Sequence, residues 1–424
     1  MYDIGIDTIF PDVRLTSITT DKFKTGCISV NLIGALSRET AASWALLPRV
    51  LRRGCEEYPG MESIAAALDD LYGARIEPIV RKKGELHSVG FYADFPDDRY
   101  IPEEENIFEK TISLLGKILL APELIDGMLR ADYVESEKKN LIDDIKASIN
   151  DKRGYSIDRL LEEMCSDETF GVSKLGSEKE AEEINPETLT MHYRSLLRES
   201  RIEIFYCGSA ASERAASAMR SALRLLPERS GKPLPATNVV LYPAGDAPRR
   251  FCESLDVTQG KLTVGFRLGK VMENPDYTAL MVFNSLYGGS ISSKLFLNVR
   301  ERLSLCYYAS SYIEKHKGVM IVASGVEFSK FDDALDEILA QLENVKNGEV
   351  SDWELTSAKR YVITSIKAAM DRPGGLEELY FDSASAAVPY DPADLCGSVE
   401  AVTLGRIVEI ASGVKPDAIF LLKD

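Results

Sequence analysis

The sequence lacks a long hydrophobic segment. A helix that spans a membrane needs about 20 consecutive, mostly apolar residues, and no such run occurs in the chain. The N-terminal residues also lack the basic start and apolar stretch of a secretory signal peptide. We therefore expect no membrane partner and a cytoplasmic location.

Positive charge is also scarce. Lys and Arg number 50 against 67 Asp and Glu, a formal net charge of −17, and the basic residues do not gather in one stripe. Proteins that bind nucleic acids usually present a concentrated basic surface to the phosphates. The composition therefore argues against a DNA or RNA partner.

Residues that ligate metals are few and scattered. The seven cysteines show no C-x-x-C spacing and lie mostly in apolar contexts, which is typical of reduced thiols in a cytoplasmic core. The three histidines, His87, His192 and His316, fall on separate predicted elements, and none has a second histidine four residues away. We expect them to be structural or surface histidines and not metal ligands.

What is present is a long chain of ordinary globular composition, with 424 residues of which 45% are hydrophobic. This length predicts two or more domains. In the first half, alternating apolar and polar residues predict a strand at 24–32. Further strands are predicted at 74–80, 87–95 and 201–207, and helices at 41–53, 59–72, 104–119, 127–150, 185–197 and 211–226.

The pattern then starts again. Gly26 and Gly260 lie 234 residues apart, as do Gly54 and Gly288, and strand, turn and helix recur in the same order. This indicates a duplicated unit. The proline-rich stretch between the copies is typical of a linker. The predicted domains are therefore 1–226 and 250–424, joined by a linker at 227–249. Later strands are predicted at 306–313 and 318–326, and helices at 330–345 and from Ser351, where Ser351 and Glu354 form a capping box.

The stretch 288–308 is the most informative part of the second copy. Two glycines open it, and a helix follows in which apolar residues are spaced by four, at Ile291, Leu295, Val299 and Leu303. That spacing predicts one buried face, with Lys294 and Arg302 in solvent. The helix should end near Ser304, which leaves Arg300 at its C-terminus and Tyr307 at the start of the next strand.

Arg300 and Tyr307 have two interpretations. A guanidinium beside a phenol can hydrogen-bond a peptide carbonyl and stabilise the negative charge that develops on it. The alternative is a solvated helix arginine next to a strand tyrosine. Spacing alone does not decide between them.

The order of elements, the duplication and this stretch together resemble the pitrilysin/insulinase family of zinc peptidases, which includes the mitochondrial processing peptidase. The resemblance covers nearly the whole chain and includes Leu175-Gly-Ser-Glu-Lys-Glu180. It implies an α+β fold of two homologous domains, each an antiparallel sheet packed on helices, arranged as a clamshell. Within the family, the chain is similar to the zinc-less YmfF-like branch.

Members of the family bind zinc through an inverted H-x-x-E-H helix. Aligned on Gly54, that slot here contains Ala45, Pro48 and Arg49 where the first histidine, the glutamate and the second histidine belong. Asp144 occupies the position of the third ligand, and Glu137 matches a nearby family glutamate. The resemblance therefore implies a degenerate site, with no cofactor bound by this chain.

In the family, the matching Arg and Tyr contact the substrate backbone and the developing oxyanion. The resemblance thus implies the same roles for Arg300 and Tyr307, acting in trans for a partner's zinc site. It also implies that the loop of Gly288, Gly289 and Ser290 touches substrate, the alternative being only a turn at the start of the helix.

The function implied is that of a non-zinc-binding subunit of a heterodimeric metallopeptidase. A homologous partner would carry the zinc, and the substrates would be short or unfolded peptides. Two alternatives stay open. One is a non-catalytic peptide-binding or assembly subunit, and the other is an independent enzyme that uses Glu137 and Asp144, although helix carboxylates seven apart usually form a solvated face.

Overall fold

The computed structural model describes residues 2–102, 105–389 and 391–424. The chain forms two compact units, and neither is continuous in sequence. Unit 1 contains the residues up to Lys146 together with Val172–Ala236 and Ala369–Ser385, and unit 2 contains the segments Ala147–Gly171, Thr237–Ala368 and Ala386–Asp424.

Unit 1 is built on a six-stranded sheet with the order β1-β2-β8-β3-β5-β4. The neighbouring strands are antiparallel except for β2 and β8, which are parallel. The strands are β1 (Asp3–Phe10), β2 (Val13–Thr19), β3 (Thr25–Ala35), β4 (Arg75–Lys83), β5 (Leu86–Pro96) and β8 (Arg201–Gly208).

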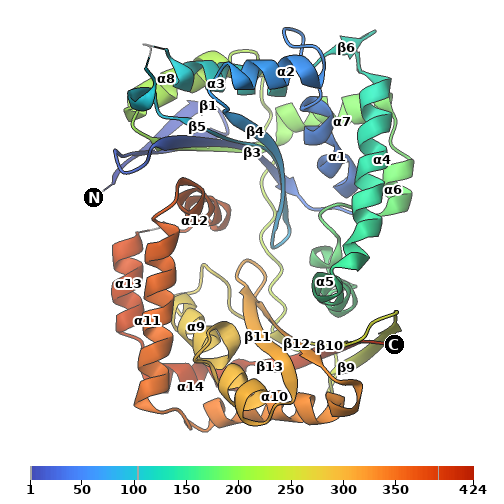
Figure 1. Cartoon of the computed structure of the whole chain (residues 1–424), viewed down its shortest axis with the longest axis vertical. Helices are drawn as coiled ribbons and strands as arrows, with labels where there is room; N and C mark the ends of the chain where they lie inside the picture. Colours follow the sequence, from blue (N-terminus) through green and yellow to red (C-terminus); the bar gives the residue numbers. More distant parts are fainter. Residues whose placement is uncertain (1, 103–104, 390) are drawn as a thin grey trace. The chain divides into compact units, whose positions relative to one another are not determined.

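The two faces of this sheet differ in character. On β3, Ile28, Val30 and Leu32 point into the main hydrophobic core, which the helices α1 (Ala41–Leu51), α3 (Ile107–Leu120) and α8 (Ser212–Ala222) help to form. Ser29 points to the opposite face, where its hydroxyl donates to Glu377 of α12 (Pro373–Ala386). Figure 1 shows α3 and α8 on one side of the sheet and α12 on the other. The predicted alternation on β3 is therefore confirmed.

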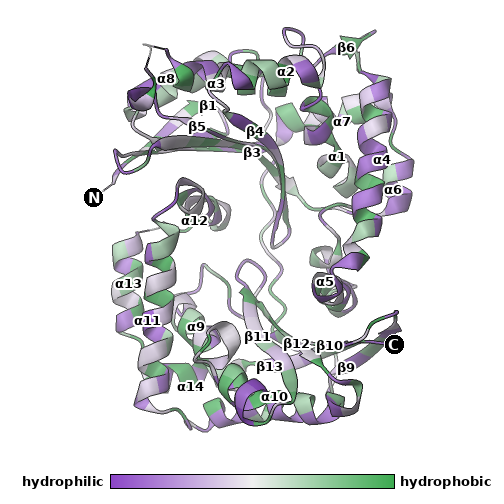
Figure 2. Cartoon of the chain, in the orientation of Figure 1, coloured by the Kyte–Doolittle hydropathy of each residue, from purple (hydrophilic) through white to green (hydrophobic). Residues whose placement is uncertain are grey.

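The remaining elements of unit 1 surround this core. They are α2 (Gly60–Asp69), a short hairpin of β6 (Leu124–Ile125) and β7 (Met128–Leu129), α4 (Ala131–Ala147), α6 (Glu178–Glu182) and α7 (Pro186–Glu199). The ribbon of α4 is mostly hydrophilic in colour (Figure 2), and its buried residues are Tyr133, Val134 and Leu141. The hairpin precedes α4 where the sequence predicted a single helix over 127–150.

Unit 2 is built on a five-stranded sheet with the order β11-β12-β10-β13-β9. The strands are β9 (Arg249–Ser254), β10 (Gly260–Arg267), β11 (Cys306–Glu314), β12 (Val319–Val326) and β13 (Lys415–Lys423). Its helices are α5 (Lys152–Met164), α9 (Tyr277–Asn284), α10 (Phe331–Lys346), α11 (Asp352–Ala369), α13 (Pro392–Glu400) and α14 (Leu404–Gly413). Two π-helical segments, η4 (Ser285–Gly289) and η5 (Leu295–Arg302), lie between α9 and β11.

The two sheets share one topology. The order β2-β8-β3-β5-β4 of unit 1 corresponds strand for strand to β9-β13-β10-β12-β11 of unit 2. In each sheet the first pair is parallel, β2 with β8 and β9 with β13. The duplication predicted from the glycine spacing is thus confirmed, and the chain contains two homologous α+β units.

Each unit also takes one helix from the other half of the chain. In unit 2, Leu160 and Met164 of α5 pack in an apolar cluster against β12 and β13. Gly265 on β10 allows this approach, because a Cβ there would lie 2.4 Å from the Met164 sulfur. In unit 1, α12 covers the second face of the sheet. The sequence predicted neither helix, and residues 227–248 contain no helix or strand.

Charged side chains buried in unit 2 hold the segment around α5 in place. Arg267 is 3% exposed and donates to Asp417 at 2.7 Å and to Glu168 at 2.6 Å. Lys317 lies 2.8 Å from the second oxygen of Glu168. Burial acts to raise the pKa of Glu168, but the hydrogen bonds from these two cations outweigh it and lower the pKa. The segment is thus tied to the sheet by a compensated charge network.

Candidate functional site

The degenerate metal slot lies between α1 and α4. Ala45 and Pro48 of α1 are buried, and Arg49 is half-buried. The Nη1 of Arg49 donates to Oδ2 of Asp144 on α4 at 2.7 Å. One turn further along, Arg53 lies 3.1 Å from Glu137. Two ion pairs therefore connect the end of α1 to α4. One of them joins Arg49 and Asp144, which stand at positions where the family resemblance places metal ligands.

This slot does not fit zinc. It offers no imidazole, and its candidate carboxylate, Asp144, already accepts from a guanidinium, whereas protein zinc sites use three or four nitrogen, sulfur or carboxylate ligands. Across residues 2–102, 105–389 and 391–424, no group of three or more His, Cys, Asp or Glu side chains could hold a metal ion. Glu137 and Asp144 are each paired with arginine, which also leaves no free carboxylate pair for acid–base chemistry.

Two of the three histidines converge on the residue next to this slot. The ring of His87 on β5 stacks on Trp44 with a centroid distance of 5.2 Å, and His192 on α7 meets Trp44 edge-on at 5.9 Å. Burial lowers the pKa of His87 to about 3 and that of His192 to about 4. Sequence spacing gave no sign of this convergence, because the three residues lie on different elements.

Arg300 lies near the end of the π-helical segment η5. Its guanidinium sits over the Phe296 ring at 4.8 Å, and its Nε lies 3.5 Å from Glu301. Ser304, with φ of 50°, turns the chain from η5 into β11. The helix therefore ends where the sequence predicted. π-Helical turns are rare and occur frequently at functional sites.

Tyr307 lies at the start of β11, an edge strand of the unit 2 sheet. The strand register shifts between Cys306 and Tyr308, so Tyr307 is the extra residue of a β-bulge, and it is 60% exposed. Bulges at sheet edges often redirect a side chain toward an active site. The bulge thus presents the phenol to solvent while Cys306 beside it is buried.

Arg300 and Tyr307 line the same open cavity of about 350 Å³. The full lining is Arg300, Glu301, Ser304, Leu305, Cys306, Tyr307 and Glu327. The structure therefore brings together the two residues that the sequence paired, as two hydrogen-bond donors on one concave surface. A peptide carbonyl entering this cavity would find both a charged and a neutral donor.

The three loop residues predicted to touch substrate lie outside the lining of this cavity. Gly288 is buried, and a Cβ on it would lie 2.6 Å from the Ser311 hydroxyl and 2.7 Å from Leu295. The Ser290 hydroxyl donates to the carbonyl of Ser285 at 3.0 Å. Close packing thus accounts for Gly288, and the substrate contact of Gly288, Gly289 and Ser290 stays a prediction.

Two expectations for this stretch are wrong. Leu295 and Val299 are buried as predicted, but Ile291 is 76% exposed and Leu303 is exposed as well. Lys294, expected in solvent, is only 7% exposed in its side chain and pairs with Glu354 at 2.9 Å. The first error arises because Ile291 and Leu303 lie in turns on either side of η5, outside the helical segment that the spacing of four assumes.

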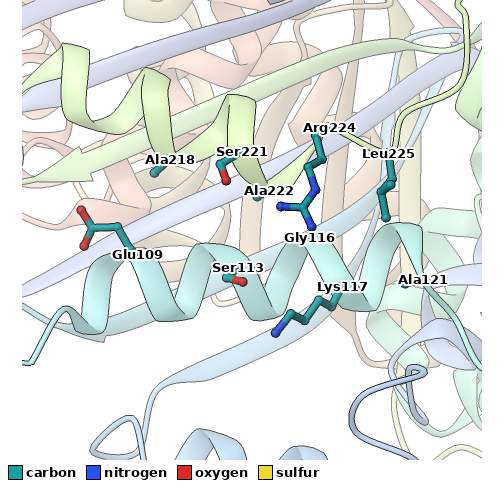
Figure 3. A pocket seen from close by; sticks show the side chains of 10 residues that line it. All are labelled: Glu109, Ser113, Gly116, Lys117, Ala121, Ala218, Ser221, Ala222, Arg224 and Leu225. Atoms are coloured by element: carbon teal, nitrogen blue, oxygen red, sulfur yellow. The ribbon is translucent and has the colours of Figure 1, made fainter.

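A further hollow lies between α3 and α8 in unit 1. It has a volume of about 210 Å³, and small residues of both helices form its floor (Figure 3). Gly116 approaches α8 so closely that a Cβ would lie 2.7 Å from the Ala222 carbonyl oxygen. In Figure 3, Arg224 extends from the end of α8 toward α3. This hollow is explained by close helix packing, and it contains none of the predicted site residues.

The fold and these sites agree with the comparisons. A family model described as "Peptidase M16 inactive domain" matches residues 183–362. The chain is 31% identical over 409 residues to the "probable inactive metalloprotease YmfF" of Bacillus subtilis (strain 168), covering 96% of this chain and 94% of that protein. The chain therefore belongs to the pitrilysin/insulinase (M16) family.

Within that family, the match to YmfF assigns it to the zinc-less YmfF-like branch. Two solved structures are also similar. A conserved protein from Enterococcus faecalis V583 is 26% identical with a TM-score of 0.88, and the match covers 99% of this chain and 98% of that one. A peptidase M16 inactive domain from Pseudomonas fluorescens is 13% identical with a TM-score of 0.80, with coverage of 99% and 98%; this second likeness concerns the fold alone.

The comparisons and the structure agree on the inactive M16 class. In the described part of the chain, no helix has the length and apolar character that crossing a membrane requires. The features that sequence reasoning missed are the ion pairs of Arg49 and Arg53, the π-helical geometry around Arg300 and the bulge at Tyr307. All three depend on packing or strand pairing between residues far apart in the sequence, so no local sequence pattern predicts them.

Proposed function

We propose that this chain is the zinc-less subunit of a heterodimeric M16 peptidase and that it presents Arg300 and Tyr307 to a peptide held by a zinc-bearing, homologous partner. The observation that carries this proposal is the shared cavity of about 350 Å³, which the two residues line. The ion pair of Arg49 and Asp144, which fills the slot in unit 1, supports the part of the proposal that this chain itself holds no zinc.

In this proposal, the partner contributes the zinc and the water that it activates, and this chain contributes hydrogen-bond donors. The guanidinium of Arg300 and the hydroxyl of Tyr307 donate to the carbonyl oxygen of the scissile peptide. Both bonds strengthen as negative charge develops on that oxygen, so they lower the barrier more than they tighten substrate binding. The proposed substrates are short or unfolded peptides, and the proposed location is the cytoplasm.

The alternative is a peptide-binding or assembly subunit with no part in hydrolysis. One observation favours it, because Arg300 already stacks on Phe296 and lies near Glu301. A guanidinium held in this way has a structural use that does not require a substrate. The two functions are distinguished by turnover and not by binding.

The test uses the complex reconstituted with its zinc-bearing partner, which is identified by purifying the tagged chain from its host. We expect Arg300→Ala and Tyr307→Phe each to reduce turnover by roughly 10- to 1,000-fold, the range for the loss of one oxyanion donor. Because both groups serve one transition state, the double variant should lose less than the product of the single losses.

Arg302→Ala is the matched control. Arg302 lies on the same π-helical segment and is exposed, but it does not line the cavity. Its removal should leave turnover unchanged, and all variants should assemble with the partner as the parent does. Full turnover by the intact complex that carries both Arg300→Ala and Tyr307→Phe would reject the catalytic role and favour the alternative.

A further inference from the structure

A second cavity, in unit 1, has a distinct chemical character. It has a volume of about 380 Å³ and lies where the end of β4 meets α12 and the segment before α6. Its lining is Val80, Arg81, Lys82, Lys83, Tyr92, Lys174, Gly374, Glu377 and Glu378. Four of these nine residues are cationic in a chain whose formal net charge is −17.

Two of the cations are held in fixed positions by buried carboxylates of α12. Arg81 donates to both oxygens of Glu377, at 2.8 and 2.9 Å, and the Glu377 side chain is 2% exposed. Lys83 lies 2.7 Å from Asp382, whose side chain is 1% exposed. A bidentate pair uses two of the five N–H groups of a guanidinium. Arg81 is thus oriented by Glu377 and retains donors for another acceptor.

The other two cations are Lys82, which lies between Arg81 and Lys83 on β4, and Lys174, which lies in the segment before α6. The Nζ of Lys82 donates to the carbonyl of Val172 at 3.2 Å, which ties the end of β4 to the segment that carries Lys174. Lys174 is exposed, and within the part of the chain that the structure describes it has no ion pair. Its ammonium group is therefore available to a ligand, together with the remaining N–H groups of Arg81.

The two carboxylates of the lining, Glu377 and Glu378, differ in how strongly they oppose an anionic ligand. Glu377 has both oxygens engaged by Arg81, and one of them also accepts from the Ser29 hydroxyl at 2.7 Å. Glu378 is exposed at the rim and opposes an anionic ligand. Because Glu378 is exposed, water and salt screen its repulsion of an anionic ligand more strongly than they screen the charges of the buried groups.

We propose that this cavity binds a carboxylate group of a peptide, with Lys174 and Arg81 as its donors. The carboxylate comes either from the C-terminus of the peptide or from an Asp or Glu side chain. This inference deepens the proposed function and rests on it in one respect, namely that the ligand is a peptide. It defines a preference for anionic peptides at a site separate in sequence from Arg300 and Tyr307.

Binding of fluorescent peptides to the full-length chain tests the proposal without the partner and without turnover. Three peptides of one neutral sequence are compared: one with a free C-terminal acid, one amidated with an internal aspartate, and one amidated without acidic groups. We expect one or both acidic peptides to bind roughly 10-fold more tightly than the neutral amide, because a charge-assisted hydrogen bond is lost with the carboxylate. Tighter binding of the free acid identifies the C-terminus as the source of the carboxylate, and tighter binding of the aspartate peptide identifies a side chain.

Lys174→Glu should remove this preference, and Glu378→Gln should increase affinity for the acidic peptides. Lys179→Glu is the matched control, since Lys179 is an exposed lysine of unit 1 on α6 outside the cavity lining. It makes the same change in net charge and should leave affinity unchanged. Arg81 is not substituted, because its loss would leave the buried Glu377 without its partner.

Equal binding of acidic and neutral peptides, or equal loss with Lys174→Glu and Lys179→Glu, would overturn the proposal. A second result would also overturn it. If inorganic phosphate displaces the acidic peptides and acetate at the same concentration does not, the site selects phosphate and not a carboxylate. A failure of the catalytic proposal looks different. In that case Arg300→Ala and Tyr307→Phe leave turnover intact while Lys174→Glu still abolishes the preference for acidic peptides.

Discussion

At the residue scale, Trp44 organises two titratable groups that are held neutral. His87 stacks on its ring and is fully buried, whereas His192 meets its edge and is half-buried, with its Nε2 shielded from solvent. A charged imidazolium loses its hydration when it is buried, so the neutral form is favoured and the pKa falls. The pKa of His87 drops to about 3 and that of His192 to about 4.

This burial predicts acid sensitivity. Both folded pKa values lie below the value of about 6.5 for an unfolded histidine, so below pH 6.5 the unfolded chain binds more protons than the folded one. Stability is therefore fully present above pH 6.5 and falls as pH decreases toward 4. Each histidine should contribute a loss of at most about 1.4 kcal/mol per pH unit in that window. Urea unfolding at a series of pH values measures the slope.

Other groups also titrate in acid, so the comparison is between variants. His87→Phe and His192→Phe keep an aromatic ring against Trp44 and remove the titrating nitrogens. Each should flatten the dependence of unfolding free energy on pH between 6.5 and 4. A slope identical to that of the parent in both variants would show that these histidines have the same pKa in the folded and the unfolded chain.

At the element scale, an ion pair joins α1 and α4 at positions where the family resemblance places metal ligands. The pair of Arg49 with Asp144 is partly exposed, so it contributes little free energy. Its chief consequence is chemical. A guanidinium in the slot repels a dication, and the aspartate it engages is no longer free to act as a ligand.

Rebuilding the zinc motif in this chain should therefore fail to make a good peptidase. The variant combines Ala45→His, Pro48→Glu, Arg49→His and Asp144→Glu. Ligands must lie within about 0.5 Å of their required positions, and neighbouring residues must orient the imidazoles. Here Ala45 is fully buried, and Arg53 engages Glu137 behind the slot. We expect weak zinc uptake without turnover.

Elemental analysis after dialysis against zinc, together with peptide hydrolysis, checks this expectation. The unmodified chain, carried through the same dialysis, serves as the control and should retain no stoichiometric zinc. Efficient cleavage by the rebuilt chain alone would contradict the prediction, and it would also show that a partner is not needed for this active site.

Two irregular elements set the geometry of the other candidate site. A regular α-helix and an unbroken strand would orient Arg300 and Tyr307 differently, because each inserted residue rotates the side chains that follow it. The π-helical segment η5 and the bulge on β11 therefore determine that both side chains line one cavity.

At the scale of the whole molecule, the two halves of the chain are not separable. Helix α5 belongs to the first half of the sequence but packs in unit 2, and α12 belongs to the second half but packs in unit 1. The two helices dock differently. Helix α5 covers an apolar face with Leu160 and Met164, whereas α12 is anchored by the buried carboxylates of Glu377 and Asp382.

The exchange predicts that a fragment of the second half will not fold alone. Residues 237–424 lack α5, which leaves Ile321 and Phe420 of the sheet without their cover. Exposed apolar surface of this kind promotes aggregation. We expect the fragment to aggregate and to become soluble when a peptide of residues 147–171 is added. Circular dichroism and size-exclusion chromatography measure both states.

A peptide carrying Leu160→Asp is the control for this experiment. It retains most of the charge and length of the segment but places a carboxylate in the apolar cluster, which is costly without a partner. It should not restore solubility. A fragment that is folded and monodisperse without any added peptide would contradict the prediction.

The sequence by itself determined the features that depend on local pattern or on the presence of particular side chains. Alternation on β3, the capping box of Ser351 with Glu354 and the repeat marked by Gly26 and Gly260 all appear in the structure as predicted. The loss of the zinc ligands could also be inferred from the sequence, because the family's zinc motif uses histidine side chains as ligands and Ala45 and Arg49 cannot replace them. These conclusions need no knowledge of which elements meet.

Only the tertiary structure decided which distant groups meet. The partners of Arg49, Lys294 and Arg81 lie 95, 60 and 296 residues away along the chain. The exchange of α5 and α12 and the contacts of His87 and His192 with Trp44 likewise follow from packing between separate elements. Such contacts are selected by the total free energy of the folded chain, and the local periodicity of a segment carries no information about them.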